Sequence, residues 1–317
     1  MVAALTGGAS AQPADFSQRL REGQLLRAHD RFAEARQVYR ALLQDVRKDS
    51  SNHRLEALVL DNLGVDEQDS GDYAAAETAF NHGISVFSAQ AAADDPILVA
   101  LKSHLAELYI AEIRPDDAEP LLRQTVAALR SSRVPSPIQL SVSTEDLAVV
   151  FILRRKFAEP EVLLRDAQSL IENAVGPDDP RLTSSLMTYA GLLIAQHRFA
   201  AAIEPAERAL RLVNTTAIPI TKPYIASVLS VLSAVYFHAG RRADAISYAH
   251  KAVEIAEASL GPQHPRLGLY LANYAYILRS GGHRNEAKAA QKRADEIVEQ
   301  HPLAASRGYT VNVAALR

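Results

Sequence analysis

Four side chains near the middle of the sequence have the residue types of a metal site or an acid–base pair. His104 and Glu107 precede Glu145 and Asp146 by about one 42-residue interval. Imidazole and carboxylate groups can share a metal ion or transfer a proton where a fold brings them together. Because the chain has no cysteine, a metal site would need such ligands. We expect these four side chains to be polar positions on a binding surface instead.

No other motif indicates an enzyme. The sequence has no glycine-rich phosphate loop, no G-x-S-x-G and no H-E-x-x-H motif. Its ten histidines are scattered, and none lies three or four residues from another. We therefore predict no catalytic residue, no cofactor and no bound metal ion.

The composition favours a helical interaction protein. Of the 317 residues, 48% are hydrophobic and 22% are charged, which is typical of a globular chain. The net charge of −3 argues against a broad basic surface for nucleic acid or anionic lipid. With no Trp and 6% aromatic residues, any core must be aliphatic and rich in alanine, and Gly 14 and Pro 15 are too few for a turn-rich β protein.

The chain has one segment to test as a membrane span and one to test as an export signal. Residues 224–240 carry no charged side chain, but Ser227, Ser230 and Ser233 interrupt them, so we predict a buried helix and no membrane span. Within residues 1–12, the run Ala9-Ser10-Ala11 has the small residues of a signal-peptide cleavage site. Residues 1–12 are either a signal-peptide remnant or a flexible leader, and the pattern favours an exported, periplasmic location over a cytoplasmic one.

Small residues recur in three columns at intervals of 41 to 43 residues. The column that opens the second helix of each unit consists of Ala35, Ala76, Ala118, Pro160, Ala202, Ala245 and Ala287. Twelve residues earlier are Gly23, Gly64, Ala106, Ala148, Ala190, Ser233 and Ala275, and seven residues later are Leu42, Gly83, Thr125, Ala167, Ala209, Ala252 and Ala294. Such columns predict antiparallel helix pairs whose axes approach closely at the small side chains.

Proline and glycine mark the predicted helix ends. Pro13, Pro96, Pro180, Pro223 and Pro265 lie 22 residues before the second-helix column. Proline is favoured at the first position of a helix, and Asp95 and Asp179 just before two of these prolines are good N-caps. Gly176 and Gly261 stand where a helix ends with positive φ.

These columns resemble tetratricopeptide repeats, and the later units are similar to the 42-residue version of kinesin light chains. The stretches that carry the resemblance are 117–121, 176–182 and 260–265. The resemblance implies an all-α, right-handed solenoid of about seven antiparallel helical hairpins over residues 13–301, with residues 302–317 as a C-terminal tail. In that tail Tyr309, Val311 and Val313 alternate with polar residues, as in a strand.

The resemblance also implies that the first helix of each unit lines a concave groove. One row of residues on these helices consists of Arg21, Asn62, His104, Asp146, Thr188, Val231 and Asn273. Similar rows in kinesin light chains carry asparagines that bind the backbone of extended peptides, which here applies only to Asn62 and Asn273. A second row consists of Arg27, Gln68, Ile110, Ile152, Ile194, Phe237 and Arg279, with Val149 on the same side.

Each row has two interpretations. The polar row either contacts a ligand or is merely solvated, and the apolar centre of the second row either binds a partner or packs between repeats. We predict a non-enzymatic scaffold or adaptor that binds an extended protein segment in the groove. The alternative is a regulatory or sensory subunit that binds a small ligand or signal peptide.

Overall fold

The computed structural model describes residues 13–29, 31–48, 52–217 and 220–300, and in these ranges the chain forms helices and turns without strands. The helices are α1 (Pro13–Ala28), α2 (Phe32–Val46), α3 (His53–Asp69), α4 (Tyr73–Phe87), α5 (Pro96–Ala111), α6 (Pro115–Ser131), α7 (Pro137–Leu153), α8 (Ala158–Val175), α9 (Leu182–Ala195), α10 (Ile203–Thr215), α11 (Lys222–His238), α12 (Arg242–Leu260), α13 (Pro265–Ser280) and α14 (Arg284–Gln300). The predicted all-α series of helix pairs is confirmed. The predicted leader, residues 1–12, and the predicted tail, residues 302–317, lie outside the described residues.

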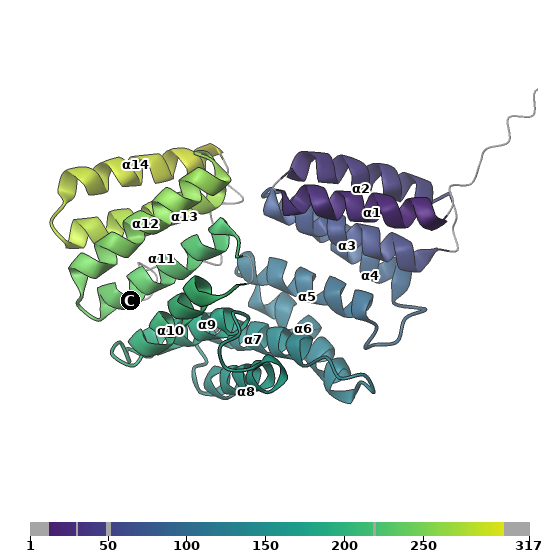
Figure 1. Cartoon of the computed structure of the whole chain (residues 1–317), viewed down its shortest axis with the longest axis horizontal. Coiled ribbons are helices and arrows are strands. Elements are labelled where there is room, and N and C mark those ends of the chain that lie inside the picture. The colour runs from purple at the N-terminus through teal and green to yellow at the C-terminus, as the bar shows by residue number, and fades with distance from the viewer. Residues whose placement is uncertain (1–12, 30, 49–51, 218–219, 301–317) are drawn as a thin grey trace, which may run out of the picture. The chain divides into compact units, whose positions relative to one another are not determined.

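The helices fall into two compact units, Met1–Leu108 and Tyr109–Arg317, and α5 contains the boundary between them. Unit 1 contains α1–α2, α3–α4 and most of α5. Unit 2 contains α6 and the four hairpins α7–α8, α9–α10, α11–α12 and α13–α14 (Figure 1). Within unit 2, each second helix also packs against the first helix of the next hairpin.

All three small-residue columns are buried, as close helix approach requires. At Gly64, an added Cβ would lie 2.5 Å from Cε1 of Phe80 on the partner helix α4. Gly23 faces the ring of Tyr39 on α2 in the same way. A glycine is needed at these two positions because a large aromatic ring occupies the space that a methyl group would take.

The predicted starts at Pro13, Pro96 and Pro265 are confirmed, whereas α9 begins at Leu182, two residues after Pro180, and α11 begins at Lys222, one residue before Pro223. The side chains of Asp95 and Asp179 each accept a hydrogen bond of 2.9 Å from the backbone N–H two residues on. Gly176 and Gly261 end α8 and α12 with φ of 100° and 91°. The apolar segment from 224 to 240 forms most of α11, a largely buried helix of unit 2. In the described part of the chain, none of the helices is long and apolar enough to cross a membrane.

In the turns that follow α3, α5, α7, α9, α11 and α13, one residue lies in the left-handed region of backbone space. Glycine takes this position in three turns, as Gly71, Gly240 and Gly282. Three other turns use Ile113, Arg155 and His197, with φ of 55°, 56° and 59°. A side chain with a Cβ is strained in this conformation, and a β-branched residue such as Ile113 is strained most.

Arginine–carboxylate pairs link the successive second helices of unit 2. They are Arg130–Asp166, Arg208–Glu172, Arg241–Glu207 and Arg293–Glu257, with N–O distances of 3.7, 2.9, 3.7 and 2.6 Å. The backbones of these helices do not come into contact with one another. Long, partly exposed side chains therefore bridge the outer row of helices, whereas apolar packing holds each hairpin together.

Candidate functional site

The first helices of successive hairpins form the inner layer of each unit. In unit 2, the backbones of α7 and α9, α9 and α11, and α11 and α13 come into contact, whereas those of α8, α10, α12 and α14 do not. In unit 1, α1 contacts α3, whereas α2 and α4 stay apart. A stack whose first helices lie closer together than its second helices curves toward the first helices, which therefore line its inner surface.

Buried polar side chains are concentrated on this inner layer. Among the described residues, Thr125 is the one buried polar side chain on a second helix. Those on first helices are Asp61, Asn62, Asp66, Glu67, Ser103, Ser141, Ser143, Thr144, Glu145, Asp146, Thr183, Ser185, Ser230, Ser233 and Asn273. Because burying polar groups is costly unless they are hydrogen-bonded, this distribution marks the first helices as the chemically specialised face.

In unit 1 an acidic cluster joins α1, α3 and α5. Nδ1 of His104 lies 2.7 Å from Oδ1 of Asp61. Arg27 on α1 approaches Asp66 through Nε at 3.2 Å and Asp69 through Nη2 at 3.1 Å. The side chain of Asp66 is fully buried, and neither of its oxygens receives a hydrogen bond. Its charge is therefore compensated mainly by Arg27, with a smaller contribution from Arg36.

The pKa values of this cluster shift in one direction. Burial raises the pKa of Asp66 to about 7, and Asp69 adds to the rise while Arg27 opposes it. Burial also raises the pKa of Glu107, and the negative charges of Asp61 and Asp69 raise it further. For His104, burial opposes protonation, but the hydrogen bond and the charge of Asp61 outweigh burial and raise the pKa. Three groups of the inner surface therefore take up protons more readily than they do in water.

In unit 2 a second polar network joins α7 to α9. The side chain of Glu145 accepts hydrogen bonds from Ser184 at 2.6 Å and from Thr188 at 2.8 Å. The pKa of Tyr224 on α11 is raised, mainly because Tyr224 itself is buried and also because the negative charge of Glu145 lies nearby. Within the described residues, no three His, Asp or Glu side chains are arranged to hold a metal ion. His104 and Glu107 lie in unit 1, whereas Glu145 and Asp146 lie in unit 2.

The residues of the predicted polar row differ in exposure. Arg21 is exposed, and His104 and Thr188 are half-buried. Asn62, Asp146 and Asn273 are buried. The amide of Asn62 donates to the carbonyl of Leu58 at 2.8 Å, and its oxygen accepts from Gln24 and Tyr39 at 3.4 and 3.5 Å. Asn62 therefore already has partners on its own helix and on both helices of the first hairpin.

The predicted apolar row is divided between core and surface. Ile194 is fully buried in the core cluster that also contains Leu232 and Val235, and Val149 is 9% exposed. Of the two interpretations left open for this row, Ile194 follows the second, because neighbouring hairpins pack over it. Ile152 and Phe237 are half-buried and keep part of their surface accessible.

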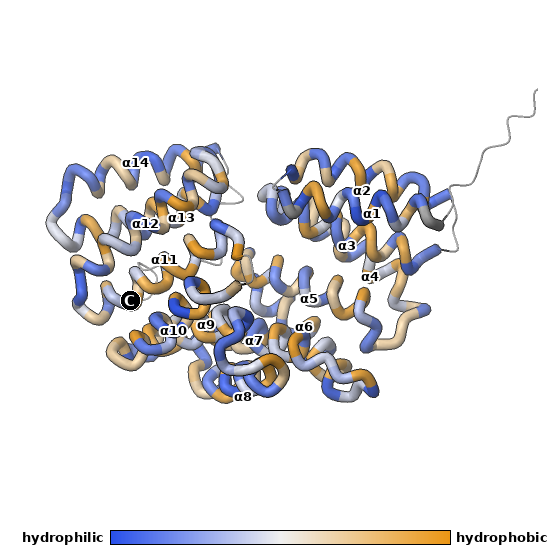
Figure 2. Tube along the Cα trace, viewed as in Figure 1, coloured by the Kyte–Doolittle hydropathy of each residue, from blue (hydrophilic) through white to orange (hydrophobic). Residues whose placement is uncertain are grey.

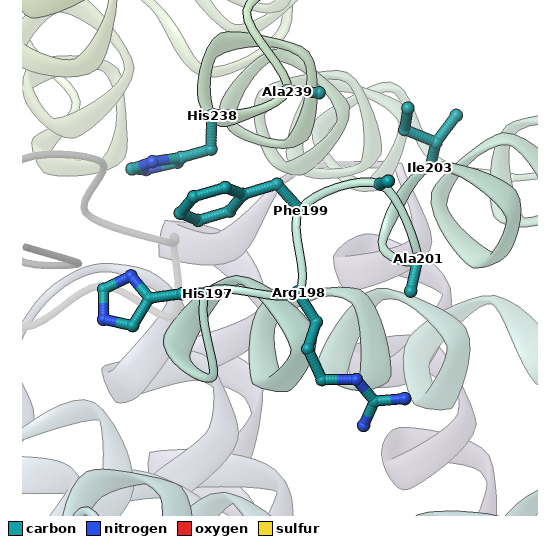
Figure 3. Close-up of a pocket in the computed structure, with 8 residues that line it drawn as sticks. His197, Arg198, Phe199, Ala201, Ile203, His238 and Ala239 are labelled. Atoms are coloured by element: carbon teal, nitrogen blue, oxygen red, sulfur yellow. The ribbon is translucent and has the colours of Figure 1, made fainter.

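Unit 2 also contains an open pocket of about 570 Å³ at the turn ends of α9–α10 and α11–α12. In Figure 3 the ring of Phe199 lies between the imidazoles of His197 and His238, and Arg198 extends away from the rings. The ring centroids of Phe199 and His238 are 5.3 Å apart, in stacked geometry. From His238 the ring contacts continue through Phe237 to Tyr276 on α13.

The backbone before α10 departs from the repeat at this pocket. Phe199 corresponds to Tyr73, the residue at which α4 begins, but α10 begins four residues later, at Ile203. The intervening N–H groups of Ala201 and Ala202 bond three residues back, to Arg198 and Phe199. This tighter turn with 3₁₀-type hydrogen bonds replaces the first turn of the helix. The small-residue columns did not predict it, because Ala202 keeps its buried position.

Comparison with known proteins agrees with this architecture. Residues 224–300 match the sequence model of the tetratricopeptide repeat family. The fold is a tetratricopeptide-repeat solenoid. Among curated proteins, none matches the sequence.

Three solved structures show how widely this repeat fold is shared. A Rap protein complexed with competence and sporulation factor has a TM-score of 0.70 at 11% identity and covers 96% of this chain and 78% of its own. A tetratricopeptide repeat protein from Parabacteroides merdae has a TM-score of 0.55 at 14% identity, with coverages of 91% and 98%. BtubC (BKLC) from P. vanneervenii has a TM-score of 0.51 at 21% identity, with coverages of 78% and 91%. At these identities the likeness concerns the fold alone.

Proposed function

We propose that this tetratricopeptide-repeat chain is a non-enzymatic scaffold or adaptor that binds an extended protein segment along its first helices. The observation that carries the proposal is the concentration of buried polar side chains on these helices. Helix packing alone does not require buried polar side chains, since the second helices pack with buried faces that are almost entirely apolar. An extended segment exposes backbone donors and acceptors, which need partners once water is excluded.

Particular residues fit the two parts of such a segment. The hydroxyl oxygen of Thr188, whose hydrogen bonds to Glu145, can still accept a hydrogen bond, and the amide of Asn273 can donate and accept, so both suit the segment's backbone. The accessible parts of Ile152 and Phe237 suit its apolar side chains. Apolar contacts supply most of the affinity in such grooves, and the polar residues set the register. Ile194 and Val149 support the groove from beneath, as part of the core.

The same surface suits a second function, that of a regulatory or sensory subunit. The solved Rap protein, whose TM-score to this chain is 0.70, is complexed with competence and sporulation factor. By analogy, a small ligand or signal peptide on the first helices would change the affinity of the chain for a second protein. This function predicts that two binding events are coupled, whereas a scaffold needs only one.

The test begins with a random peptide display library selected on the full chain. Enriched peptides are then titrated against three variants by fluorescence anisotropy. Phe237→Asp should weaken binding by more than about tenfold, since an apolar contact is worth roughly 1.5–3 kcal/mol. Asn273→Ala should weaken it by only about two- to tenfold, because it removes one neutral hydrogen bond.

The matched control is Asn285→Ala, which makes the same chemical change at an exposed position of α14. It should leave binding unchanged. Melting temperatures of all three variants show whether lost binding reflects lost folding. If folded Phe237→Asp and Asn273→Ala bind like the parent chain, the first helices do not form the binding surface.

A further inference from the structure

The turns inside the four hairpins of unit 2, together with the helix ends beside them, form one continuous edge of this unit. This turn edge consists of residues 153–161, 195–204, 238–244 and 279–286. Contacts join each turn to the next. The side-chain amide of Gln196 donates to the carbonyl of Phe157 at 3.2 Å. Phe199 stacks on His238, and Gly281 packs against the start of α12.

Positive charge on the turn edge exceeds negative charge. Part of it is already paired, in the contacts Arg154–Glu119, Arg198–Glu161, Arg241–Asp244 and His283–Glu286. The exposed cations that form no ion pair within the described residues are Arg155, Lys156, Arg242, Arg279 and Arg284. The carboxylates that oppose them are Glu159, which is exposed, and Glu204, which lies 3.9 Å from Arg211. Figure 2 shows the hydrophilic residues at the turns of α11–α12 and α13–α14. The edge therefore attracts anionic groups.

Two turns of this edge keep a strained backbone that glycine would relieve. Arg155 and His197 have φ of 56° and 59°, at the position that Gly240 and Gly282 take in the next two turns. Glycine adopts this conformation freely, whereas a residue with a Cβ is strained. The exposed side chain of Arg155 forms no hydrogen bond or ion pair within the described residues, so it does not stabilise the fold through polar contacts. Strain that the fold does not use points to a role in binding.

The open pocket of about 570 Å³ lies within the turn edge, where the turns of α9–α10 and α11–α12 meet. The imidazoles of His197 and His238 already contact the ring of Phe199. Arg198 extends away from these rings (Figure 3). The rest of the lining is aliphatic and consists of Ile203, Ala200, Ala201 and Ala239. The pocket therefore has room for an aliphatic side chain together with the backbone that carries it.

We propose that the turn edge of unit 2 binds an acidic protein segment that places an aliphatic side chain in this pocket. Arg155 and Lys156 lie on the turn before the pocket, and Arg242 lies just after it. Carboxylates on both sides of the aliphatic residue therefore meet unpaired cations. The apolar contact supplies affinity, and the charges steer the segment and set its register. This surface is separate from the proposed binding surface on the first helices, so the chain can hold one partner on each.

Two fluorescein-labelled peptides provide the test, one with a leucine flanked by glutamates and one with a leucine flanked by glutamines. Each is titrated with the full chain and followed by fluorescence anisotropy. We expect the glutamate peptide to bind at least about tenfold more tightly, since one exposed ion pair changes affinity by up to about fivefold. Replacing its leucine by alanine should weaken binding by about tenfold, as expected for one buried leucine side chain.

The variant Arg155→Gly separates a role in binding from a role in the fold. It relieves the strained φ, so the melting temperature should rise. It also removes one cation, so the glutamate peptide should bind about two- to fivefold more weakly. Arg242→Glu should weaken binding by about fivefold or more, because attraction is replaced by repulsion. Ala201→Glu, which places a negative charge at an exposed wall position, should weaken it by more than about tenfold.

The matched controls make the same chemical changes at the opposite edge of unit 2. Arg266→Glu changes an exposed arginine at the start of α13, and Ala258→Glu changes an exposed alanine near the end of α12. Both should leave binding unchanged. Melting temperatures show which variants are folded, and the stabilised Arg155→Gly keeps the test decisive if another variant unfolds.

The following results overturn the proposal. The glutamate peptide does not bind, or it binds no better than the glutamine peptide. Arg242→Glu and Arg266→Glu weaken binding equally, which would mean that only the net charge of the chain matters. Arg155→Gly binds the glutamate peptide as tightly as the parent chain does.

Discussion

Replacing Asp66 with asparagine should remove a pH dependence of stability from unit 1. Asp66 is fully buried, and its carboxylate has Arg27 as its close ionic partner without a hydrogen bond to either oxygen. Other charged groups near it are Arg36, Glu67 and Asp69. Asparagine has nearly the same shape and stays neutral at every pH, so the variant isolates the free-energy cost of the buried charge.

The sign and size of the effect follow from the pKa of Asp66. The ordinary value of 3.8 rises to about 7 in the folded chain, so the folded state holds this proton more tightly than the unfolded state does. The stabilisation from the bound proton is fully present below pH 4 and is lost as the pH rises through 7. Three pKa units correspond to on the order of 4 kcal/mol, at about 1.4 kcal/mol per unit.

The assay is urea unfolding of the parent chain and of Asp66→Asn at several pH values from 4 to 8, followed by circular dichroism. We expect similar unfolding free energies at pH 4 and an increasing advantage of the variant up to pH 8. Comparing the two proteins cancels the contribution of the other carboxylates. A difference that does not change with pH, or a carboxyl ¹³C signal of Asp66 that titrates near pH 4, would refute the argument.

Two further predictions concern stability. Ile113→Gly should raise the free energy of unfolding by about 1 kcal/mol, because Ile113 is exposed and holds a positive φ that glycine adopts freely. The converse change Gly240→Ala should lower the free energy of unfolding by a similar amount. If both variants had the same urea midpoint as the parent chain, the strain argument would be contradicted. Ala202→Leu should destabilise by roughly 1–3 kcal/mol through overpacking, whereas Ala200→Leu at an exposed site should change the melting temperature little.

The repeat could be predicted from the sequence because close helix packing restricts residue size at fixed positions. Gly64 and Ala202 are buried against a partner helix, and any larger residue there would collide with it. The restriction is local to each hairpin, so a column of small residues at constant spacing is enough to reveal it. Helix ends were partly predictable for a similar reason, since the hydrogen bond that Asp95 accepts at the start of α5 forms within a few residues, whereas the one at Asp179 forms in the turn before α9.

The candidate site was less predictable because its contacts join residues far apart in sequence. Arg27 meets Asp66 across 39 positions, and nothing local to either residue indicates the pairing. Ile194 was placed in the groove by its register, but how neighbouring hairpins cover it depends on side-chain packing in three dimensions. The pocket beside Phe199 arises from a tightened backbone turn that leaves the small-residue columns unchanged. The one local signal at the pocket is His197 at a turn position that glycine takes in other hairpins.

The arginine–carboxylate pairs of the outer helices have a mechanical consequence for unit 2. Bending the stack changes the spacing of α8, α10, α12 and α14 more than that of the first helices, which are in backbone contact. The outer spacing is bridged by partly exposed pairs such as Arg208–Glu172 and Arg293–Glu257, whose attraction weakens as ionic strength rises. Unit 2 therefore combines a closely packed inner layer with outer contacts that depend on salt. At high ionic strength it should bend more easily while each hairpin stays folded.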